Sequence, residues 1–426
     1  MVQNKQKVCV VGLGYVGFPL SVLCSVKGYE VFGYDPDEKK TKRIQKGENI
    51  VDEEYLDELI PQAKIKIIKN FEQAKKCDIF LICVPTPVDE KYYPDLSYIK
   101  SAAEDVAKNV KAGALVILES TVNPGVSEEV VAPIFEKHGW QVGKDIHISH
   151  CPERINPGDK VWTLKNIPRV VGSFDKKGLK MTMDFYKNIL EAEVMPMKTI
   201  REAEAVKIVE NSFRDVNIAF VNELARSFDI LDIDVVNVIR GAATKPFAFM
   251  AHWPSCGVGG HCIPVDPYYL IEKAKEKEFD HKFLRIAREI NNDMRPYTVD
   301  LLARSLNSIG KAVKNTPIGI LGLSYKANVG DLRESPSKKI IELLKKQGAE
   351  LFAYDPHLSQ RSNVKSFDEL LKKSEALVLI TNHDEFVYAP VEKFKENGIK
   401  VIVDGKNCLD KEKILGLGIV YKGIGR

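Results

Sequence analysis

The sequence predicts an α/β fold that contains two parallel sheets. Short apolar runs alternate with segments of helical composition, which is typical of parallel sheets covered by helices on both faces. The pattern occurs twice, because VCVVGLGY at 8–15 and VFGYDPDE at 31–38 are echoed by IGILGLSY at 318–325 and LFAYDPHL at 351–358. We therefore expect two Rossmann-like domains joined by a long central helix.

In the first half, apolar runs predict the strands and longer amphipathic segments predict the helices. We expect strands at 8–11, 30–34, 77–84 and 114–119, and helices at 19–27, 97–108 and 127–138. These elements alternate along the chain, so they predict one N-terminal domain over residues 1–199.

The segment at 200–231 contains no proline or glycine and predicts one long helix. Its apolar residues recur at helical spacing and form a stripe of Val206, Val209, Phe213, Val216, Phe220 and Leu224. Two interpretations stay open: the stripe forms a subunit interface, or it packs within the monomer. A central helical domain over 200–312 follows from this segment.

The second α/β block predicts a C-terminal domain over 313–426. Strands are expected at 318–323, 350–354, 376–380 and 399–403, with a helix at 337–346. This half lacks the full glycine pattern of the first. The length of 426 residues agrees with three domains of about 150 residues each.

Composition and charge exclude several classes of protein. Apolar residues make up 44% and charged residues 28% of the chain, so it is neither disordered nor fibrous. The net charge is only +3 and no long basic block occurs, which argues against a nucleic-acid partner. An anionic ligand therefore requires a local binding site.

Cysteine usage and the N-terminal region predict a cytoplasmic protein without a membrane anchor. The eight cysteines are scattered without a Cys-x-x-Cys pair, as in reduced proteins. Lys5 and Lys7 precede an apolar stretch at 8–26, as in an export signal. However, glycines and Pro19 interrupt this stretch, and no small-residue cleavage site follows it.

The first chemical motif predicts a dinucleotide site. It follows the first strand, opens a helix and consists of Gly12, Leu13, Gly14, Tyr15, Val16 and Gly17. Glycines in such a turn allow the backbone to approach a pyrophosphate, and the helix N-terminus supplies N–H donors. Asp35, at the end of the second strand, is suited to accept from a ribose 2′-hydroxyl and to repel a 2′-phosphate. NAD is therefore favoured over NADP.

The second motif is a glycine-rich loop at 257–266 that contains Cys262. Three interpretations stay open: a nucleophilic thiol accessible to a substrate, a buried cysteine in a tight turn, and a zinc ligand. The zinc interpretation rests on nearby histidines and cysteines, namely His252, Cys256 and His261, with a second group at His147, His150 and Cys151. Neither group has the paired spacing of a structural zinc site, so no metal is expected.

The third motif is the pair Lys207 and Asn211, which lie one helical turn apart on one face of the long helix. Taken alone, such a lysine is a solvated surface charge. Beside a nucleotide domain and a candidate thiol, a cation and an amide are suited to stabilise an alkoxide or to position a water.

In this order, the motifs resemble the UDP-glucose and GDP-mannose dehydrogenase family over nearly the whole chain. Besides the Lys207 and Asn211 pair, the matching segments are VGLGYVG at 11–17, ESTVNPG at 119–125, CPERINPG at 151–158, GVGGHCIPVDP at 257–267 and LGLSYKANVGDLRES at 321–335. The resemblance implies an NAD domain, a central dimerisation segment and a C-terminal UDP-sugar domain. It also implies homodimers or higher oligomers, and a role in polysaccharide biosynthesis.

The family's activity is a four-electron oxidation of a sugar C6 alcohol to a carboxylate with two NAD molecules. The resemblance assigns Cys262 as the nucleophile that forms a thiohemiacetal and then a thioester. It assigns Lys207 and Asn211 to the oxyanion and the substrate, and Asp266 to a water or a proton, although a loop cap before Pro267 is an alternative for Asp266. The remaining implied residues are Thr121 near the nicotinamide, Glu153 and Arg154 at the sugar, Gly259 at the substrate, Thr86 at NAD, Lys326 at the UDP phosphates and Arg333 toward NAD. Surface charges are an alternative for Lys326 and Arg333.

Two departures from the UDP-glucose branch bear on the sugar. That branch carries a second carboxylate after the Pro-Glu pair and a lysine before the final aspartate, whereas here Arg154 follows Glu153 and Val265 takes the place of the lysine. The segments PERINPG and GGHCIPVDPYYL resemble the branch that oxidises UDP-N-acetylhexosamines. The expected substrate is thus the UDP derivative of N-acetylglucosamine, N-acetylmannosamine or N-acetylgalactosamine.

Several alternatives remain open at this point. UDP-glucose or GDP-mannose is an alternative substrate. A one-step hydroxyacid dehydrogenase shares the nucleotide turn and the lysine and asparagine pair but needs no thiol. A non-catalytic sensor of nucleotide sugars shares the fold alone.

Overall fold

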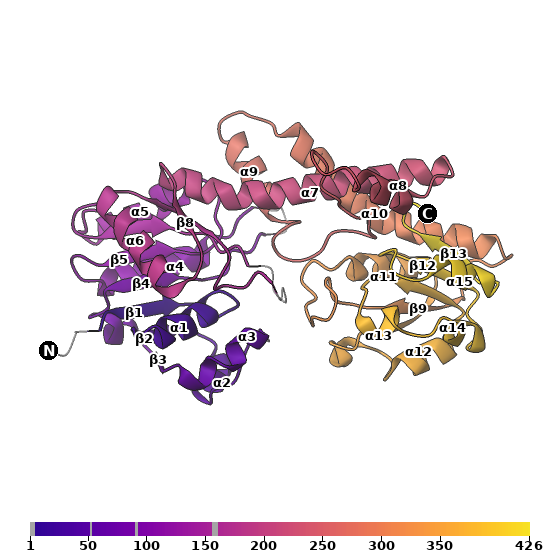
Figure 1. Ribbon diagram of the computed structural model, residues 1–426, viewed down its shortest axis with the longest axis horizontal. Helices are drawn as coiled ribbons and strands as arrows, with labels where there is room; N and C mark the ends of the chain where they lie inside the picture. Colours follow the sequence, from indigo (N-terminus) through magenta and orange to yellow (C-terminus); the bar gives the residue numbers. More distant parts are fainter. Residues whose placement is uncertain (1–4, 52, 90–92, 156–160) are drawn as a thin grey trace. The chain divides into compact units, whose positions relative to one another are not determined.

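The computed structural model describes residues 5–51, 53–89, 93–155 and 161–426, which form two compact units. The first unit comprises Met1–Glu210 and Tyr268–Glu278, and the second comprises Asn211–Pro267 and Phe279–Arg426. Helices α7 (Ile200–Ile230) and α9 (Asp266–Lys275) contribute residues to both units (Figure 1). The predicted boundaries at residues 199 and 312 stay predictions.

The first unit contains an eight-stranded sheet in the order β3-β2-β1-β4-β5-β6-β7-β8 within the described residues. Its strands are β1 (Lys7–Val11), β2 (Glu30–Tyr34), β3 (Ile65–Ile67), β4 (Ile79–Ile82), β5 (Leu115–Leu118), β6 (His147–His150), β7 (Arg169–Ser173) and β8 (Val194–Pro196). Because β2 and β4 flank β1 on opposite sides, the chain reverses its direction across the sheet beside β1. In such sheets this reversal is where nucleotides bind.

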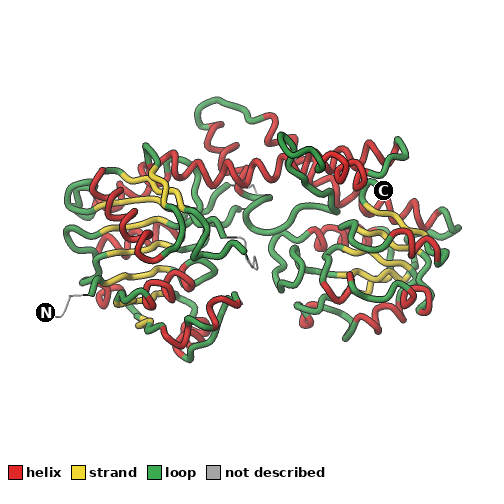
Figure 2. Tube along the Cα trace, viewed as in Figure 1, coloured by secondary structure: helices red, strands yellow, loops and turns green. Residues whose placement is uncertain are grey.

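Both faces of this sheet are buried, as alternation along β1 shows. Val8 and Val10 join an apolar cluster with α1 (Gly17–Val26) and α6 (Lys176–Ile189). Cys9 and Val11 point to the other face and join α4 (Ser97–Asn109) and α5 (Ala132–Lys137). Figure 2 shows the strands of each sheet between helices. The predicted α/β class with parallel sheets is confirmed.

The second unit contains a parallel sheet in the order β10-β9-β11-β12-β13. Its strands are β9 (Pro317–Leu321), β10 (Glu350–Tyr354), β11 (Ala376–Leu379), β12 (Val401–Asp404) and β13 (Val420–Gly423). One face packs on α10 (Lys282–Asn307) and α11 (Pro336–Lys346), and the other packs on α12 (Phe367–Lys373), α13 (Asp384–Val387), α14 (Glu392–Glu396) and α15 (Lys411–Gly416).

The remaining helical segments are short and lie outside the two sheets. They are α2 (Glu38–Gln45), α3 (Glu54–Asp57), α8 (Val235–Ala242), the 3-10 turns Ile60–Gln62, Phe71–Ala74 and Ser359–Arg361, and a π turn at Ser127–Val131. Asp37 caps α2 by accepting from the Lys39 and Lys40 amides, which explains why this helix begins directly after β2.

The structure differs from the sequence prediction by one or two residues at several element ends, and more clearly at the following elements. The strand expected at 77–84 is shortened to β4, and the helix expected at 127–138 begins as the π turn. Pro133 lacks an N–H and lies at the start of α5, where the wide turn gives way to regular helix. Strand β7 runs antiparallel to β6, because the described residues between them form no crossover helix.

The apolar stripe of α7 does not pack entirely within the chain. Val209, Phe213 and Phe220 are 56%, 51% and 53% exposed, so the interpretation that places the whole stripe inside the monomer is wrong. Val206, Val216 and Leu224 are partly buried. The subunit-interface interpretation stays a prediction.

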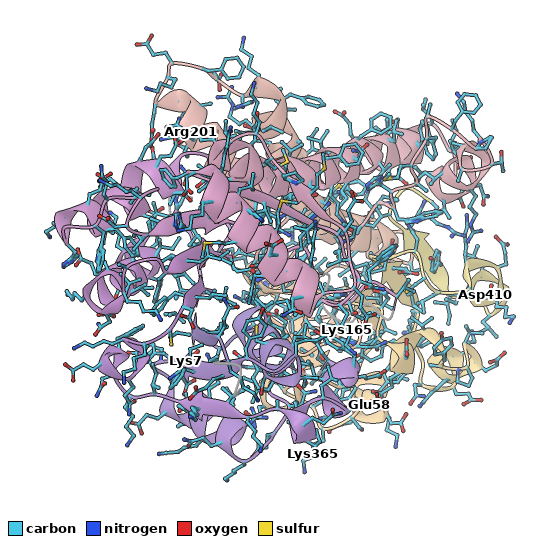
Figure 3. The ribbon with its side chains drawn as sticks, turned by 60° about the vertical axis from the view of Figure 1, so that its left-hand side comes forward. Lys7, Glu58, Lys165, Arg201, Lys365 and Asp410 are labelled. Atoms are coloured by element: carbon cyan, nitrogen blue, oxygen red, sulfur yellow. The ribbon has the colours of Figure 1, made fainter. Side chains whose placement is uncertain are left out.

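The sequence contains no long basic block, and many charged side chains lie on the surface. Figure 3 shows Arg201, Lys365 and Asp410 pointing away from the ribbon, and all three residues are exposed. Within the described ranges, no helix combines the length and the apolar character that a bilayer crossing requires. No three His, Cys, Asp or Glu side chains of the described residues come together as metal ligands would.

Candidate active site

The glycine turn after β1 has the geometry that a dinucleotide requires. Gly12 has a φ of 91°, and a Cβ there would lie 2.6 Å from the Cys83 carbonyl oxygen. A Cβ on Gly17 would lie 1.9 Å from the Gly12 carbonyl oxygen. Gly14, in contrast, faces open space, so a phosphate can approach its backbone. These residues therefore fit the pyrophosphate of NAD at the N-terminus of α1.

Asp35 is fixed beside this turn and retains capacity for a further donor. Its Oδ2 accepts from the Leu13 amide at 2.9 Å and from Lys40 Nζ at 2.7 Å, and its Oδ1 accepts from the Asp37 amide at 2.9 Å. A carboxylate has about four lone-pair sites, so three donors leave room for one ribose hydroxyl.

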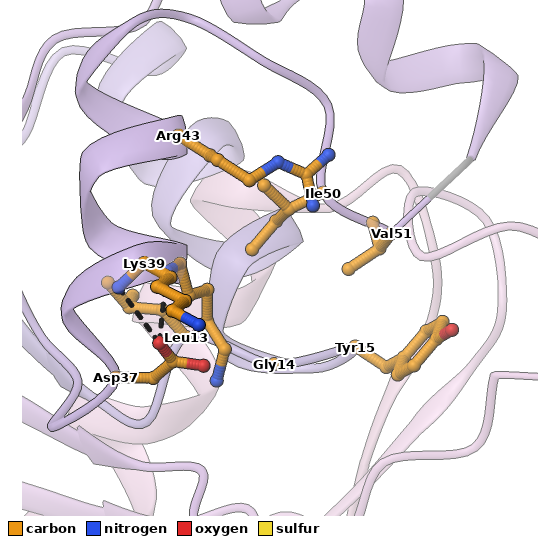
Figure 4. Close-up of a pocket in the computed structure, with 9 residues that line it drawn as sticks. Leu13, Gly14, Tyr15, Asp37, Lys39, Arg43, Ile50 and Val51 are labelled. Atoms are coloured by element: carbon orange, nitrogen blue, oxygen red, sulfur yellow. Dashed lines mark hydrogen bonds between the residues drawn. The ribbon is translucent and has the colours of Figure 1, made fainter.

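A cavity of about 310 Å³ lies next to this carboxylate and fits the adenosine half of a dinucleotide. Figure 4 shows its wall, which consists of Leu13, Gly14, Tyr15, Asp37, Lys39, Lys40, Arg43, Ile50 and Val51. Apolar side chains at Ile50 and Val51 face polar groups from α2, which is the mixture that small-molecule sites use.

The loops after β4 and β5 are tied together by Thr86 and Thr121. The Thr86 hydroxyl donates to the Thr121 carbonyl oxygen at 2.8 Å, and the Tyr269 hydroxyl donates to the Thr86 carbonyl oxygen. The structure thus brings the two predicted threonines together at the carboxyl edge of the sheet, where β1, β4 and β5 also end.

Glu204 connects the β5 loop to the central helix. Its buried carboxylate accepts from the Gly125 amide at 2.6 Å and from the Ser127 amide at 2.8 Å, and it lies one turn before Lys207 on α7. Burial raises the pKa of Glu204, although the two backbone amides oppose this shift. Lys207 itself is buried, at 8% exposure, so it is not the solvated surface charge of the alternative interpretation.

Glu153 is held rigidly by a buried arginine that the sequence analysis did not identify. One carboxylate oxygen of Glu153 accepts from Arg169 at 2.7 Å, and the other accepts from the Arg154 and Ile155 amides at 2.6 and 2.8 Å. Arg169 is fully buried on β7 and also pairs with Glu119 at 3.5 Å. An arginine within the apolar run RVVG is the signal that would have indicated this role.

Glu119 completes this buried cluster and carries the perturbed pKa. Burial raises the pKa of Glu119 to about 7, Arg169 lowers it, and Glu153 raises it again. The Tyr186 hydroxyl donates to Glu119. The cluster therefore holds two carboxyl groups around one guanidinium, directly before Thr121 in the chain.

Arg154 contacts the central helix in this structure. Its side chain donates to Glu210 at 2.5 and 3.3 Å and to the Pro168 carbonyl oxygen at 2.8 Å. Its predicted role at the sugar stays a prediction. The residues that complete the CPERINPG segment, 156–158, lie outside the described residues.

In the second unit, Cys262 lies beside a histidine that the sequence analysis considered only as a metal ligand. The Cys262 sulfur lies 3.1 Å from His261 Nδ1. At this distance an imidazole is suited to take the thiol proton or to stabilise the thiolate. Neighbouring side chains do not in general face each other, so adjacency in the sequence did not indicate this contact.

The glycines before Cys262 allow close packing on a second loop. A Cβ on Gly259 would lie 2.6 Å from the Tyr325 Cβ, and one on Gly260 would lie 2.9 Å from its ring. The Gly260 amide donates to the Arg333 carbonyl oxygen at 3.0 Å. The cysteine loop therefore lies directly on the loop that follows β9.

Asn211 and Asp266 are brought together near this loop. Asn211 Nδ2 donates to Asp266 Oδ2 at 2.5 Å, and the Asp266 amide donates to the Cys262 carbonyl oxygen at 2.8 Å. Asp266 is buried at the first position of α9. The Asn211 and Asp266 side chains thus contact each other, and a backbone hydrogen bond joins Asp266 to Cys262 within the second unit.

Lys207 lies in the first unit and Cys262 in the second, so the pairing of this cation with the thiol stays a prediction. The same holds for Arg333 and NAD. Arg333 is exposed and pairs with Asp331 at 2.6 Å, and Lys326 is partly buried in the same loop.

Comparison with known proteins assigns the chain to a family. The NAD binding domain of the UDP-glucose/GDP-mannose dehydrogenase family matches residues 6–190, its central domain matches 201–293, and its UDP binding domain matches 319–411. The chain belongs to the UDP-glucose/GDP-mannose dehydrogenase family and is an NAD-dependent oxidoreductase.

Named relatives extend over nearly the whole chain. The UDP-N-acetyl-D-mannosamine dehydrogenase of Methanococcus maripaludis is 35% identical and covers 99% of this chain and 97% of its own. The UDP-N-acetyl-D-glucosamine 6-dehydrogenase of Pseudomonas aeruginosa is 33% identical, with 96% and 98% covered. The structure of the UDP-D-ManNAc dehydrogenase of Pyrococcus horikoshii matches with a TM-score of 0.92 at 34% identity, with 99% of each chain covered.

Proposed function

We propose that this chain oxidises the C6 alcohol of a UDP-N-acetylhexosamine to the carboxylate, with UDP-N-acetylmannosamine as the preferred substrate. The arrangement of Cys262, Asn211 and Asp266 in the second unit carries the proposed chemistry. The mannosamine dehydrogenases that match at 35% and 34% identity support the choice of sugar. The glucosamine enzyme of Pseudomonas aeruginosa makes UDP-N-acetylglucosamine the second candidate.

The reaction requires two hydride transfers from one carbon. NAD supplies the hydride acceptor in both. In the first oxidation, C6 loses a hydride and its hydroxyl loses a proton, which leaves an aldehyde. The Cys262 sulfur then forms a bond to C6, and the aldehyde oxygen takes up the thiol proton to give a thiohemiacetal.

The second oxidation removes the other hydride from C6 and the hydroxyl proton, which leaves a thioester. Water attacks this carbon, the bond between carbon and sulfur breaks, and the thiol and a carboxylate are released. Overall, one alcohol, two NAD molecules and one water give one carboxylate, two NADH molecules and three protons.

Each residue in this scheme has a role that its chemistry suits. Lys207 and Asn211 stabilise the oxygen on C6 as it gains negative charge. Asp266 orients the attacking water, and His261 passes the thiol proton to the aldehyde oxygen. Glu153, held by Arg169, accepts hydrogen bonds from sugar hydroxyls. Arg154 and Gly259 are further substrate-binding residues in this proposal.

A substrate panel tests this proposal. The purified chain is assayed for NADH formation with the three UDP-N-acetylhexosamines, UDP-glucose and GDP-mannose at matched concentrations. We expect the highest kcat/KM for UDP-N-acetylmannosamine and two NADH per sugar consumed. Preference for UDP-glucose would overturn the sugar, one NADH per sugar would favour a one-step dehydrogenase, and no turnover with any sugar would favour a sensor.

The proposal includes a homodimer in the cytoplasm. The exposed apolar residues Val209, Phe213 and Phe220 on α7 support an interface between copies. The eight cysteines, all of them among the described residues, form no disulfide in the structure, which supports a reducing compartment. Light scattering on the purified chain measures the oligomer directly, and a monomer would contradict the interface.

A further inference from the structure

The loop between β9 and α11 has a conformation that a buried histidine fixes. In the first sheet α1 begins at Gly17, soon after the turn at Gly12, whereas α11 begins at Pro336 although its turn begins at Gly322. The added length forms the 323–335 loop. This loop contains Lys326, the proposed contact to the UDP phosphates.

His383 lies directly behind this loop, after the end of β11. Its ring is fully buried, and Nε2 lies 3.1 Å from Asp355 Oδ2 and 3.0 Å from the Ser324 hydroxyl. The Asn328 amide donates to Nδ1 at 2.9 Å. Because Nδ1 accepts from a backbone N–H, the neutral ring carries its proton on Nε2 and donates it toward Asp355.

The bond to Asn328 acts on a strained point of the loop. Asn328 has a φ of 58°, in the left-handed region that residues other than glycine seldom occupy. The Asn328 side-chain oxygen accepts from the Asp384 amide at 3.1 Å, next to His383 in the chain. Two hydrogen bonds to the 383–384 segment therefore hold the backbone two residues beyond Lys326.

The loop in turn supports the cysteine loop. The Tyr325 amide donates to the Asp331 carbonyl oxygen at 2.9 Å, which closes the 323–335 loop on itself. Gly259 and Gly260 pack on Tyr325, and the Gly260 amide donates to the Arg333 carbonyl oxygen. A change in the loop would thus reach both Lys326 and the residues before Cys262.

We propose that His383 is a positioning residue for nucleotide-sugar binding: anchored on Asp355, its Nδ1 fixes the 323–335 loop in the conformation that presents Lys326. This inference rests on the proposed role of Lys326 in the UDP-sugar site. His383 itself does not contact the substrate in this proposal.

Two substitutions separate the two nitrogens of the ring. His383→Asn places an amide oxygen near the position of Nδ1, so it retains an acceptor for Asn328 and loses the donor to Asp355. His383→Gln places an amide nitrogen near the position of Nε2, so it retains the donor and loses the acceptor. His383→Asn removes more volume from the core than His383→Gln, because asparagine is one methylene group shorter. A larger effect of His383→Gln on UDP binding therefore cannot come from the cavity, and His383→Asn serves as its control.

The experiment measures UDP binding to the full chain by titration calorimetry, together with KM for the UDP-sugar and for NAD. We expect H383Q to raise the Kd for UDP at least tenfold and H383N to change it less than threefold, with KM for NAD unchanged in both. Equal Kd values in the two variants, whether weakened or unaltered, would overturn the positioning role. Failure of the unsubstituted chain to bind UDP would instead overturn the proposed function.

Hydrogen exchange on the unsubstituted chain tests the same idea should H383Q fail to fold. The buried bond to His383 predicts that the Asn328 amide is protected before UDP is added. Free exchange at this amide in the absence of UDP would contradict a loop that His383 has already fixed.

Discussion

Asp35 and Asp355 occupy equivalent positions in the two sheets but have different numbers of donors. Each follows the strand that pairs with the first strand of its sheet, and each accepts from the second amide after that first strand, at Leu13 or Leu323. Asp35 accepts three hydrogen bonds from described residues. Asp355 accepts five, from the Leu323, Ser324 and His357 amides, the Ser324 hydroxyl and His383.

This difference predicts a ligand-binding role for Asp35 and a structural role for Asp355. Asp355 is fully buried and four of its five donors share Oδ2, so the carboxylate is not accessible to a ribose hydroxyl. The same backbone geometry thus recurs in both sheets, with a proposed cofactor role for Asp35 and contacts to the 323–335 loop for Asp355. The position of the aspartate in the fold is the same in both sheets. The difference comes from His383 and Ser324, which donate to Asp355.

The largest expected effect concerns the proposed nucleophile Cys262, which lies in the second unit. Cys262→Ser should lower NADH formation by at least about 10³-fold, because serine is a far weaker nucleophile at neutral pH. NAD binding to the first unit should stay within twofold of the original, as measured by fluorescence titration. Normal turnover with two NADH per sugar would contradict the covalent route.

Replacing each of the two aspartates by asparagine tests the comparison between Asp35 and Asp355 directly. Asp355→Asn should destabilise the second unit by about 3 kcal/mol, since several buried donors lose their charged acceptor. Asp35→Asn should leave stability almost unchanged and raise KM for NAD about tenfold, which corresponds to about 1.4 kcal/mol for one hydrogen bond to a charged group. Urea unfolding and steady-state kinetics give both quantities.

The comparison fails if the two effects are exchanged. A large rise in KM for NAD in Asp355→Asn, with no change in its urea midpoint, would mean that the second carboxylate also serves the cofactor.

The glycine turn of the first sheet offers a sharper test of cofactor binding. Gly17→Ala should raise KM for NAD by about 10- to 100-fold, because its methyl group overlaps the Gly12 carbonyl and overpacking costs about 1–3 kcal/mol. Gly14→Ala is the matched control, since no atom lies within 4 Å of its Cβ. A methyl group at Gly14 affects only the approach of a phosphate, so Gly14→Ala should raise KM for NAD but keep the original urea midpoint, whereas Gly17→Ala should lower the midpoint. Equal midpoints in the two variants would show that Gly17 is not a packing position.

The last prediction concerns the opposite titration of two buried carboxyl groups. Burial raises the pKa of Glu119 to about 7. For Asp355, burial favours a higher pKa, but hydrogen bonds from His383 and Ser324 hold it well below its usual value. Between about pH 4.5 and 7 the folded chain retains a Glu119 proton that the unfolded chain has released, so the free energy of unfolding falls as pH rises, by at most about 1.4 kcal/mol per pH unit.

Asp355 has the opposite sign. Below about pH 4 the unfolded chain binds a proton that folded Asp355 does not, so stability is lost as the pH falls. The measurement is the difference in urea midpoint between Glu119→Gln and the original chain from about pH 5 to 7. The variant should gain relative stability as the pH rises, and a constant difference would show that Glu119 is ionised throughout.

Periodicity in the sequence was sufficient to predict the central strands of the sheets but not the strands toward their edges. The strand at 30–34 was predicted at its observed bounds, because its apolar residues end at a clear Tyr-Asp-Pro signal. β3, β6, β7, β8 and β13 were not predicted. Three-residue strands such as β3 and β8 carry too little periodicity, and β7 contains the charged Arg169.

The same division holds for the candidate site. Glycine spacing at 12–17 and the segment around Cys262 indicated the turn and the thiol, since both motifs are local. Arg169 and His383 were not predicted, because their partners Glu153 and Asp355 lie 16 and 28 residues away in the chain.

The sequence by itself determined the class of fold, the family and the residue types that the chemistry needs, because those signals depend on neighbours within a few positions. Only the tertiary structure showed that Asp355 is fully buried among five donors, whereas Asp35 is less buried and has three. The reason is that hydrogen-bond capacity is filled by donors from separate loops, and folding alone brings those loops to the same oxygen atoms.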